Sequence, residues 1–102
     1  MDNMTQLLLS YPSPEKLSCA YTYKIDDYNE FYSNLFSVGM IAMEISSMDF
    51  VDKIYARKKE VDYPEVARRL RGFKDEKLRR GVQCLLDINP NERKRVYQIW
   101  GI

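Results

Sequence analysis

The chain has 102 residues, enough for one domain with a single hydrophobic core, and its 45% hydrophobic and 30% charged residues exclude a disordered chain. Its net charge of +1 hides a balance of −5 in residues 1–50 and +6 in residues 51–102. The two halves can attract each other, which is the simpler interpretation, or present a basic face to an acidic partner.

The sequence contains no histidine, and Cys19 lies far from Cys84, so it offers neither the usual zinc ligands nor an imidazole general base. The start, Met1 to Leu9, contains an acid and only three consecutive leucines, which does not fit a signal peptide. No apolar stretch is long enough to cross a bilayer. We therefore expect a cytoplasmic protein with reduced thiols and no membrane contact.

The amino-terminal third is expected to be mainly loop. Pro12 and Pro14 disfavour a helix before residue 14, although a short helix can begin at Pro14 itself. Tyr21 to Glu30 is polar and is predicted to be an exposed loop. Three of its tyrosines lie near acidic residues and are candidate phosphorylation sites: Tyr21, Tyr23 and Tyr28. Such residues more often cover the protein surface.

The most distinctive segment is Ser33 to Ser47, which predicts a helix with two apolar stripes. The first stripe contains Leu35, Val38, Ala42 and Ile45, and the second contains Phe36, Met40 and Met43. A helix that is apolar on two faces is normally surrounded by protein. We therefore expect this helix to be central and enclosed.

Four shorter helices are predicted after the central helix. Phe50 to Lys58 has apolar residues at helical spacing and is expected to be a short amphipathic helix. Asp62-Tyr63-Pro64 marks a break and a restart, and Gly72 ends the new helix. Asp75 to Asp87 has an apolar stripe that contains Leu78, Val82, Leu85 and Leu86. Asn89-Pro90-Asn91-Glu92 then caps a last helix whose apolar residues are Val96, Ile99 and Trp100. No strand is expected, so the predicted fold class is all-α.

Four features of the chain resemble the last third of a protein kinase domain, in the family's order. Tyr11-Pro12-Ser13-Pro14-Glu15 resembles Tyr-x-Ala-Pro-Glu, which closes the activation segment. Asn34-Leu35-Phe36-Ser37-Val38-Gly39 resembles the Asp-x-Trp-Ser-x-Gly that opens the family's central helix, and Glu44 falls where that helix often has a glutamate. Cys84-Leu85 with Asn89-Pro90-Asn91-Glu92-Arg93 resembles Cys-Leu-x-x-Asp-Pro-x-x-Arg.

The resemblance covers about residues 7–100 of a single domain that spans residues 1–102. It implies a partial protein-kinase-like large lobe, with Asn34, Ser37 and Gly39 at the start of the central helix. It also implies a buried ion pair between Glu15 and Arg93, because the family joins the corresponding motifs in this way. Chance matches in an unrelated helical domain are the alternative, and would leave these two residues solvated.

Phosphoryl transfer in the family uses ATP, magnesium and groups that this sequence lacks. It has no glycine-rich phosphate loop, no His-Arg-Asp and no Asp-Phe-Gly, since Asp49-Phe50 is followed by Val51. The sequence therefore offers no catalytic, cofactor-binding or metal-binding residues, and we expect the chain alone to be inactive. Asn34 in place of aspartate and the inserted stretch from Tyr21 to Tyr32 favour a degenerate kinase or pseudokinase as the parent, although an active, divergent parent is also open.

A basic run suggests a second function, that of a non-catalytic adaptor. Its candidate docking residues are Arg68, Arg69, Arg71, Arg79 and Arg80, with Lys74 and Lys77 between them. The simpler interpretation is a solvated helix face whose long side chains cover apolar surface. No aromatic residues alternate with these basic ones, so the expected partner is a protein, or the remainder of a kinase domain, and not nucleic acid.

Overall fold

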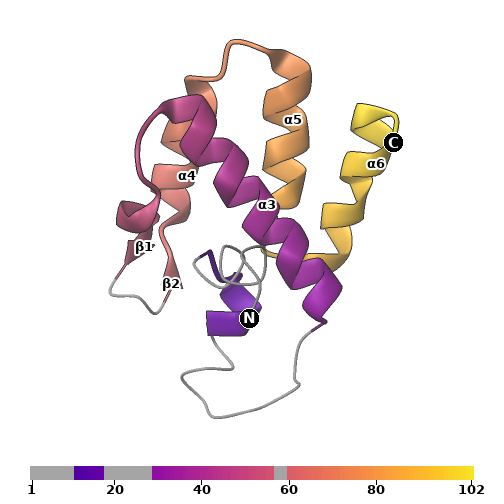
Figure 1. Ribbon diagram of the computed structural model, residues 1–102, viewed down its shortest axis with the longest axis horizontal. Coiled ribbons are helices and arrows are strands. Elements are labelled where there is room, and N and C mark those ends of the chain that lie inside the picture. The colour runs from indigo at the N-terminus through magenta and orange to yellow at the C-terminus, as the bar shows by residue number, and fades with distance from the viewer. Residues whose placement is uncertain (1–10, 18–28, 57–59) are drawn as a thin grey trace.

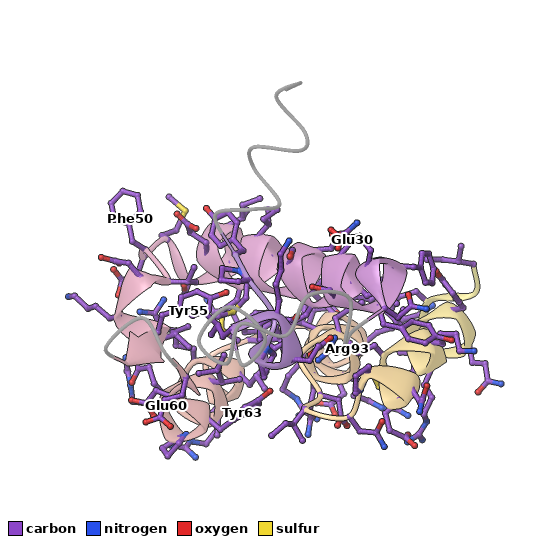
Figure 2. All side chains as sticks on the ribbon, turned by 90° about the horizontal axis from the view of Figure 1, so that it is seen from below. Glu30, Phe50, Tyr55, Glu60, Tyr63 and Arg93 are labelled. Atoms are coloured by element: carbon purple, nitrogen blue, oxygen red, sulfur yellow. The ribbon has the colours of Figure 1, made fainter. Side chains whose placement is uncertain are left out.

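The computed structural model describes residues 11–17, 29–56 and 60–102. These residues are mostly helical, and the long helix α3 runs diagonally across the molecule (Figure 1). In the view of Figure 1, helix α4 and a small hairpin lie to the left of α5 and α6, and Figure 2 shows that all of them lie beneath α3. Residues 14–17 form a short helical stretch, as predicted from Pro14. The remaining elements are α3 (Glu30–Ser47), η1 (Asp52–Ile54), β1 (Tyr55–Ala56), β2 (Glu60–Val61), α4 (Tyr63–Arg71), α5 (Glu76–Leu85), η2 (Pro90–Arg95) and α6 (Val96–Trp100).

Helix α3 begins at Glu30, three residues before the predicted start, because Asn29 caps it. The Asn29 side chain accepts a hydrogen bond from the Tyr32 backbone nitrogen at 3.2 Å, and Glu30 adds a negative charge in the first turn. Asn34 therefore lies in the second turn and does not open the helix. The helix ends at Ser47, and the capping residue that follows, Met48, adopts a left-handed conformation with φ 54°.

The two apolar stripes of α3 have different environments. Phe36, Met40 and Met43 are fully buried and belong to the main core. In the other stripe, however, Val38 is 45% and Ile45 is 68% exposed. The prediction of a helix enclosed on both faces is therefore wrong for this chain: its elements pack on one face of α3 and leave much of the other uncovered.

The helix predicted for residues 50–58 is also wrong. The described residues form one 3-10 turn, η1, followed by the antiparallel pair β1 and β2, in which Tyr55 lies opposite Val61. Val51 and Ile54 are buried, so a single turn is enough to place both apolar side chains in the core, whereas Phe50 is 73% exposed. The expectation of no strand is corrected by this short hairpin.

Helices α4 and α5 follow the prediction closely. Asp62 caps α4 by accepting from the Glu65 nitrogen at 3.2 Å, and Asp75 caps α5 by accepting from the Leu78 nitrogen at 2.9 Å. Gly72 ends α4. Most of the predicted apolar residues of these two segments are buried: Val66, Leu70, Val82, Leu85 and Leu86. The exception is Leu78, which is 38% exposed.

The carboxyl-terminal segment begins as a 3-10 helix and not as the predicted α-helix. The Asn89 side chain accepts from the Asn91 nitrogen at 3.0 Å, and Pro90 fills the first position of η2. In α6, Val96 is buried, and the Trp100 indole nitrogen donates to the Lys77 carbonyl at 3.0 Å. A Cβ atom on Gly81 would overlap the Trp100 indole, so the absence of a side chain allows α6 to pack against α5.

Candidate functional site

Arg93 is the most completely buried charged residue of the described chain, with no solvent-exposed area. Its Nη1 and Nη2 atoms donate to the two carboxylate oxygens of Glu15 at 2.6 and 2.9 Å. Nη1 also donates to the Tyr32 carbonyl at 2.8 Å, and Nε donates to the Asp87 carbonyl at 2.9 Å. The guanidinium lies 5.1 Å from the centre of the Phe36 ring. This is the pairing between residues 78 positions apart that the family resemblance predicts, in the bidentate form that suits a buried guanidinium.

Glu15 is held in place by hydrogen bonds between its own segment and α3. Ser13 and Ser33 are both buried, and their hydroxyl oxygens lie 2.7 Å apart. The Ser13 hydroxyl also accepts from the Lys16 nitrogen at 3.2 Å, which caps the helical turn that carries Glu15. No sequence pattern predicted the contact between Ser13 and Ser33, because hydroxyl pairs have no characteristic spacing.

Tyr11 connects the same segment to the far half of α3. The Ser37 hydroxyl donates to the Tyr11 carbonyl at 2.7 Å, and the Tyr11 hydroxyl donates to Glu44 Oε2 at 2.6 Å. The hydrogen bond to Glu44, together with burial, raises the pKa of Tyr11 to about 12. Ser37 and Glu44, both singled out in the sequence, are thus brought to one short stretch of chain.

Gly39 and Asn34 behave differently from each other. A Cβ atom on Gly39 would lie 2.8 Å from Leu85 Cβ, so glycine is what allows α3 and α5 to approach closely. Asn34 is partly buried, but within the described residues no hydrogen bond of its side chain is found. The resemblance would have it brace a catalytic loop, which this sequence does not contain.

Arg69 is buried and does not belong to a docking face. It donates to the Phe50 carbonyl at 2.9 Å and to the Asp49 carbonyl at 3.2 Å, and it forms ion pairs with Asp49 and Glu65 at 3.3 and 3.1 Å. It therefore holds the turn that follows α3. Its position on the same helical stripe as Val66 and Leu70 was a sequence signal for this burial.

The other arginines of the basic run are accessible. Arg68 pairs with Glu65, and Arg79 pairs with Glu76, each within its own helix. Hydrogen bonds from Arg68 and then Arg69 lower the pKa of Glu65 to about 2. Arg71 and Arg80 are exposed, and within residues 11–17, 29–56 and 60–102 no ion pair of either is found. The basic run is therefore a largely solvated surface from which Arg69 is excluded.

The two halves of the chain attract each other, as the charge balance indicated. Glu15 and Asp49, from the acidic half, pair with Arg93 and Arg69, from the basic half. The pair of Arg93 and Glu15 is mostly buried, so water and salt screen it weakly, whereas the Asp49 side chain that pairs with Arg69 is 51% exposed.

Other candidate chemistry is sparse in the described residues. No group of three or more histidine, cysteine, aspartate or glutamate side chains gathers there in a way that fits a metal ion. Burial raises the pKa of the Cys84 thiol, which makes it a poor nucleophile. No helix in this part of the chain is long and apolar enough to span a membrane. Cys19, the three candidate phosphorylation tyrosines and Leu7 to Leu9 lie outside the described residues.

Compared with models of known protein families, with curated proteins and with solved structures, the chain matches none. The resemblance to protein kinases therefore stays a prediction from the motifs and their spacing.

Proposed function

We propose that this chain is the carboxy-terminal part of a protein-kinase-like large lobe and serves as structural support for the rest of such a lobe. The single observation that carries the proposal is the buried ion pair of Glu15 and Arg93. It joins a Pro-Glu motif to an Asn-Pro-x-x-Arg motif across the core, and its guanidinium packs over Phe36 of the helix between them. Order, spacing and three-dimensional contact agree with one family pattern.

The proposed role is non-catalytic. In the family, ATP and magnesium are held by the glycine-rich loop, a strand lysine, the catalytic loop and Asp-Phe-Gly, and the sequence has none of these in its 102 residues. Phosphoryl transfer depends on positioning and charge neutralisation by those groups. We therefore expect no transfer from radiolabelled ATP by the pure chain, and measurable turnover would overturn this part of the proposal.

The outer face of α3 is the surface that we assign to the remainder of the lobe. Residues 31–43 of the helix include no charged side chain, and three of the exposed apolar residues recur every seven positions: Phe31, Val38 and Ile45. Seven-residue spacing keeps side chains on one side of a helix, as at a contact with another helix. An apolar face of this kind on an isolated chain favours association.

The test is the solution behaviour of the chain. Light scattering should detect self-association of the 102-residue chain, and the dye anilinonaphthalene sulfonate should fluoresce on the exposed face. A Val38→Lys, Ile45→Lys variant should bind less dye and associate less, while a Leu78→Lys variant changes an exposed apolar residue on α5 and serves as the control. A wild-type chain that is a monodisperse monomer without dye binding would contradict the assignment of this face.

A second candidate function is supported by the accessible arginines. Arg71 and Arg80 are exposed, and an acidic protein segment could dock on them. A polyglutamate peptide would then bind in a salt-dependent manner and lose affinity for an Arg71→Glu, Arg80→Glu variant. Equal binding by the wild-type chain and this variant would remove the adaptor role.

A further inference from the structure

A polar cavity of about 320 Å³ lies between the carboxyl-terminal end of α3 and helix α4, which lie close together (Figure 1). Ser46 and Ser47 line it from α3, and Arg68 and Arg69 line it from α4. Asp49 adds a carboxylate to its wall. The cavity therefore brings two hydroxyl groups, two guanidinium groups and one carboxylate to the same place.

The two serines of this cavity differ in how their hydroxyl groups are used. The Ser47 hydroxyl donates to the Met43 carbonyl at 2.7 Å, and its oxygen lies 3.5 Å from Arg69 Nη1. Ser46 is exposed, and within residues 11–17, 29–56 and 60–102 no hydrogen bond of its side chain is found. It is the penultimate residue of α3, and because helix ends fray, an enzyme can reach its hydroxyl.

The two arginines also differ. The Arg69 side chain is only 3% exposed and is held by the carbonyl groups of Asp49 and Phe50. The Arg68 side chain is 62% exposed and donates to Glu65 through Nε and Nη2, whereas no hydrogen bond of its Nη1 atom is found in the described part of the chain. Arg68 can thus turn toward a new anion in the cavity without disturbing the core.

The sequence around Ser46 is acidic. Glu44 lies two residues before it, and Asp49 and Asp52 lie three and six residues after it. No lysine or arginine occurs in residues 30–52. An enzyme that acts on this serine is therefore expected to recognise acidic flanking residues through basic groups of its own.

We propose that Ser46 is a phosphorylation site whose phosphoryl group is held in this cavity by Arg68, next to Arg69. The reaction is carried out by a separate serine kinase, because this chain lacks the groups for it. Ser46 Oγ attacks the γ-phosphorus of ATP, the bond from that phosphorus to the β,γ-bridging oxygen breaks, ADP leaves, and the hydroxyl proton passes to a base of that kinase. The phosphoserine carries a charge of about −1.5 to −2 near pH 7, and its oxygens accept hydrogen bonds from guanidinium groups.

Three negative features oppose the phosphoryl group, and the structure offers a way around them. They are the carboxylates of Asp49 and Glu65 and the carboxyl-terminal end of the α3 dipole. Because 51% of the Asp49 side chain is exposed, that carboxylate can turn into water and leave Arg69 Nη2 to the phosphoryl group. Glu65 keeps Arg69 Nε at 3.1 Å when Arg68 turns away. The site uses none of the motifs shared with protein kinases, so it does not depend on the kinase-lobe proposal.

The first test identifies the serine that is modified. The 102-residue chain is incubated with ATP and a serine kinase that selects acidic flanking residues, and tandem mass spectrometry locates the added phosphate. Ser46→Ala should lose the modification within residues 44–52, whereas the matched variant Ser47→Ala should keep it. A wild-type chain that stays unmodified in this segment, or a loss in Ser47→Ala alone, would overturn the assignment.

The second test asks whether the cavity holds the phosphoryl group. The chain is produced with phosphoserine incorporated at position 46, and phosphorus NMR follows the second ionisation of the phosphate as the pH is changed. Because a guanidinium favours the dianion, Arg68→Gln should raise the pKa of this phosphate by about 0.5. Arg71→Gln makes the same charge change on the same helix, but Arg71 is not among the described lining residues, so its effect should be much smaller. Equal effects of the two variants would show that net charge, and not the cavity, acts on the phosphate.

Discussion

Substitution of Glu15 by glutamine should strongly destabilise the fold, because it leaves the charge of Arg93 buried without a counterion. The Arg93 side chain has no exposed area, whereas 18% of the Glu15 side chain is exposed. In the variant, the guanidinium would keep its bonds to the Asp87 and Tyr32 carbonyls. The glutamine amide group would face one of the guanidinium nitrogens, so a donor would meet a donor.

The magnitude follows from this burial. Removing one partner of a buried ion pair typically costs about 3–5 kcal/mol, and we expect about 3 kcal/mol because some water reaches Glu15. A chain of this size has roughly 5–15 kcal/mol of total stability, so the loss is a large fraction of it. With a urea slope of about 1–3 kcal/mol per molar, the unfolding midpoint should fall by roughly 1–3 M.

Urea unfolding followed by far-ultraviolet circular dichroism measures this shift. The control is Glu76→Gln, which removes an exposed carboxylate paired with Arg79 inside one helix and should shift the midpoint far less than Glu15→Gln. Arg93→Lys should resemble Glu15→Gln, because an ammonium cannot form the bidentate pair. If Glu15→Gln and Glu76→Gln shift the midpoint equally, the reasoning from burial is refuted.

Three further predictions concern other packed groups. Gly81→Ala should cost about 1–3 kcal/mol, because the new methyl group displaces the Trp100 indole; a red shift of tryptophan emission would report the displacement. Tyr55→Phe should increase the free energy of unfolding by about 1 kcal/mol and so raise the urea midpoint. The reason is that the Tyr55 hydroxyl is buried and has no hydrogen-bond partner among the described atoms. A lower midpoint would contradict this prediction. Burial raises the pKa of Tyr55, and burial also raises that of Tyr63 to about 12, while the hydrogen bond to Glu44 raises that of Tyr11 to about 12. The folded state therefore holds these protons more tightly than the unfolded state. The free energy of unfolding should be unchanged below about pH 10 and should fall between about pH 10 and 12. Urea unfolding at pH 9 and at pH 11 would measure this loss.

Controls for these predictions are available in the chain. Gly72→Ala places its new methyl group at an ordinary contact distance, 3.4 Å from the Arg69 carbonyl, and should leave the emission of Trp100 unchanged. The alkaline loss of stability should be smaller in Tyr55→Phe than in the wild-type chain. An equal loss in the two proteins would contradict the assignment to buried Tyr55.

The sequence was most informative where local chemistry determines the structure. The restart of the helix at Asp62-Tyr63-Pro64, its end at Gly72 and the apolar stripes of α4 and α5 could be predicted, because turn residues and helical periodicity act over three or four residues. The partnership of Glu15 with Arg93 could be predicted only from the family resemblance, since no local rule joins residues 78 positions apart.

Prediction failed where tertiary packing decides. Periodicity could not distinguish a helix over residues 50–58 from one buried turn followed by a hairpin, because Val51 and Ile54 occupy the core in either case. Charge suggested that Arg69 was exposed, but the carbonyl groups at the end of α3 provide partners that make its burial favourable.

The genomic sequence upstream of the Met1 codon is the most direct test of membership in a kinase-like lobe. We predict an open reading frame that runs into this chain and encodes, in order, a glycine-rich loop, a His-Arg-Asp catalytic loop or its degenerate counterpart, and Asp-Phe-Gly or its remnant. An in-frame stop codon close to Met1, with no such sequence before it, would contradict the proposal and leave a free-standing helical domain.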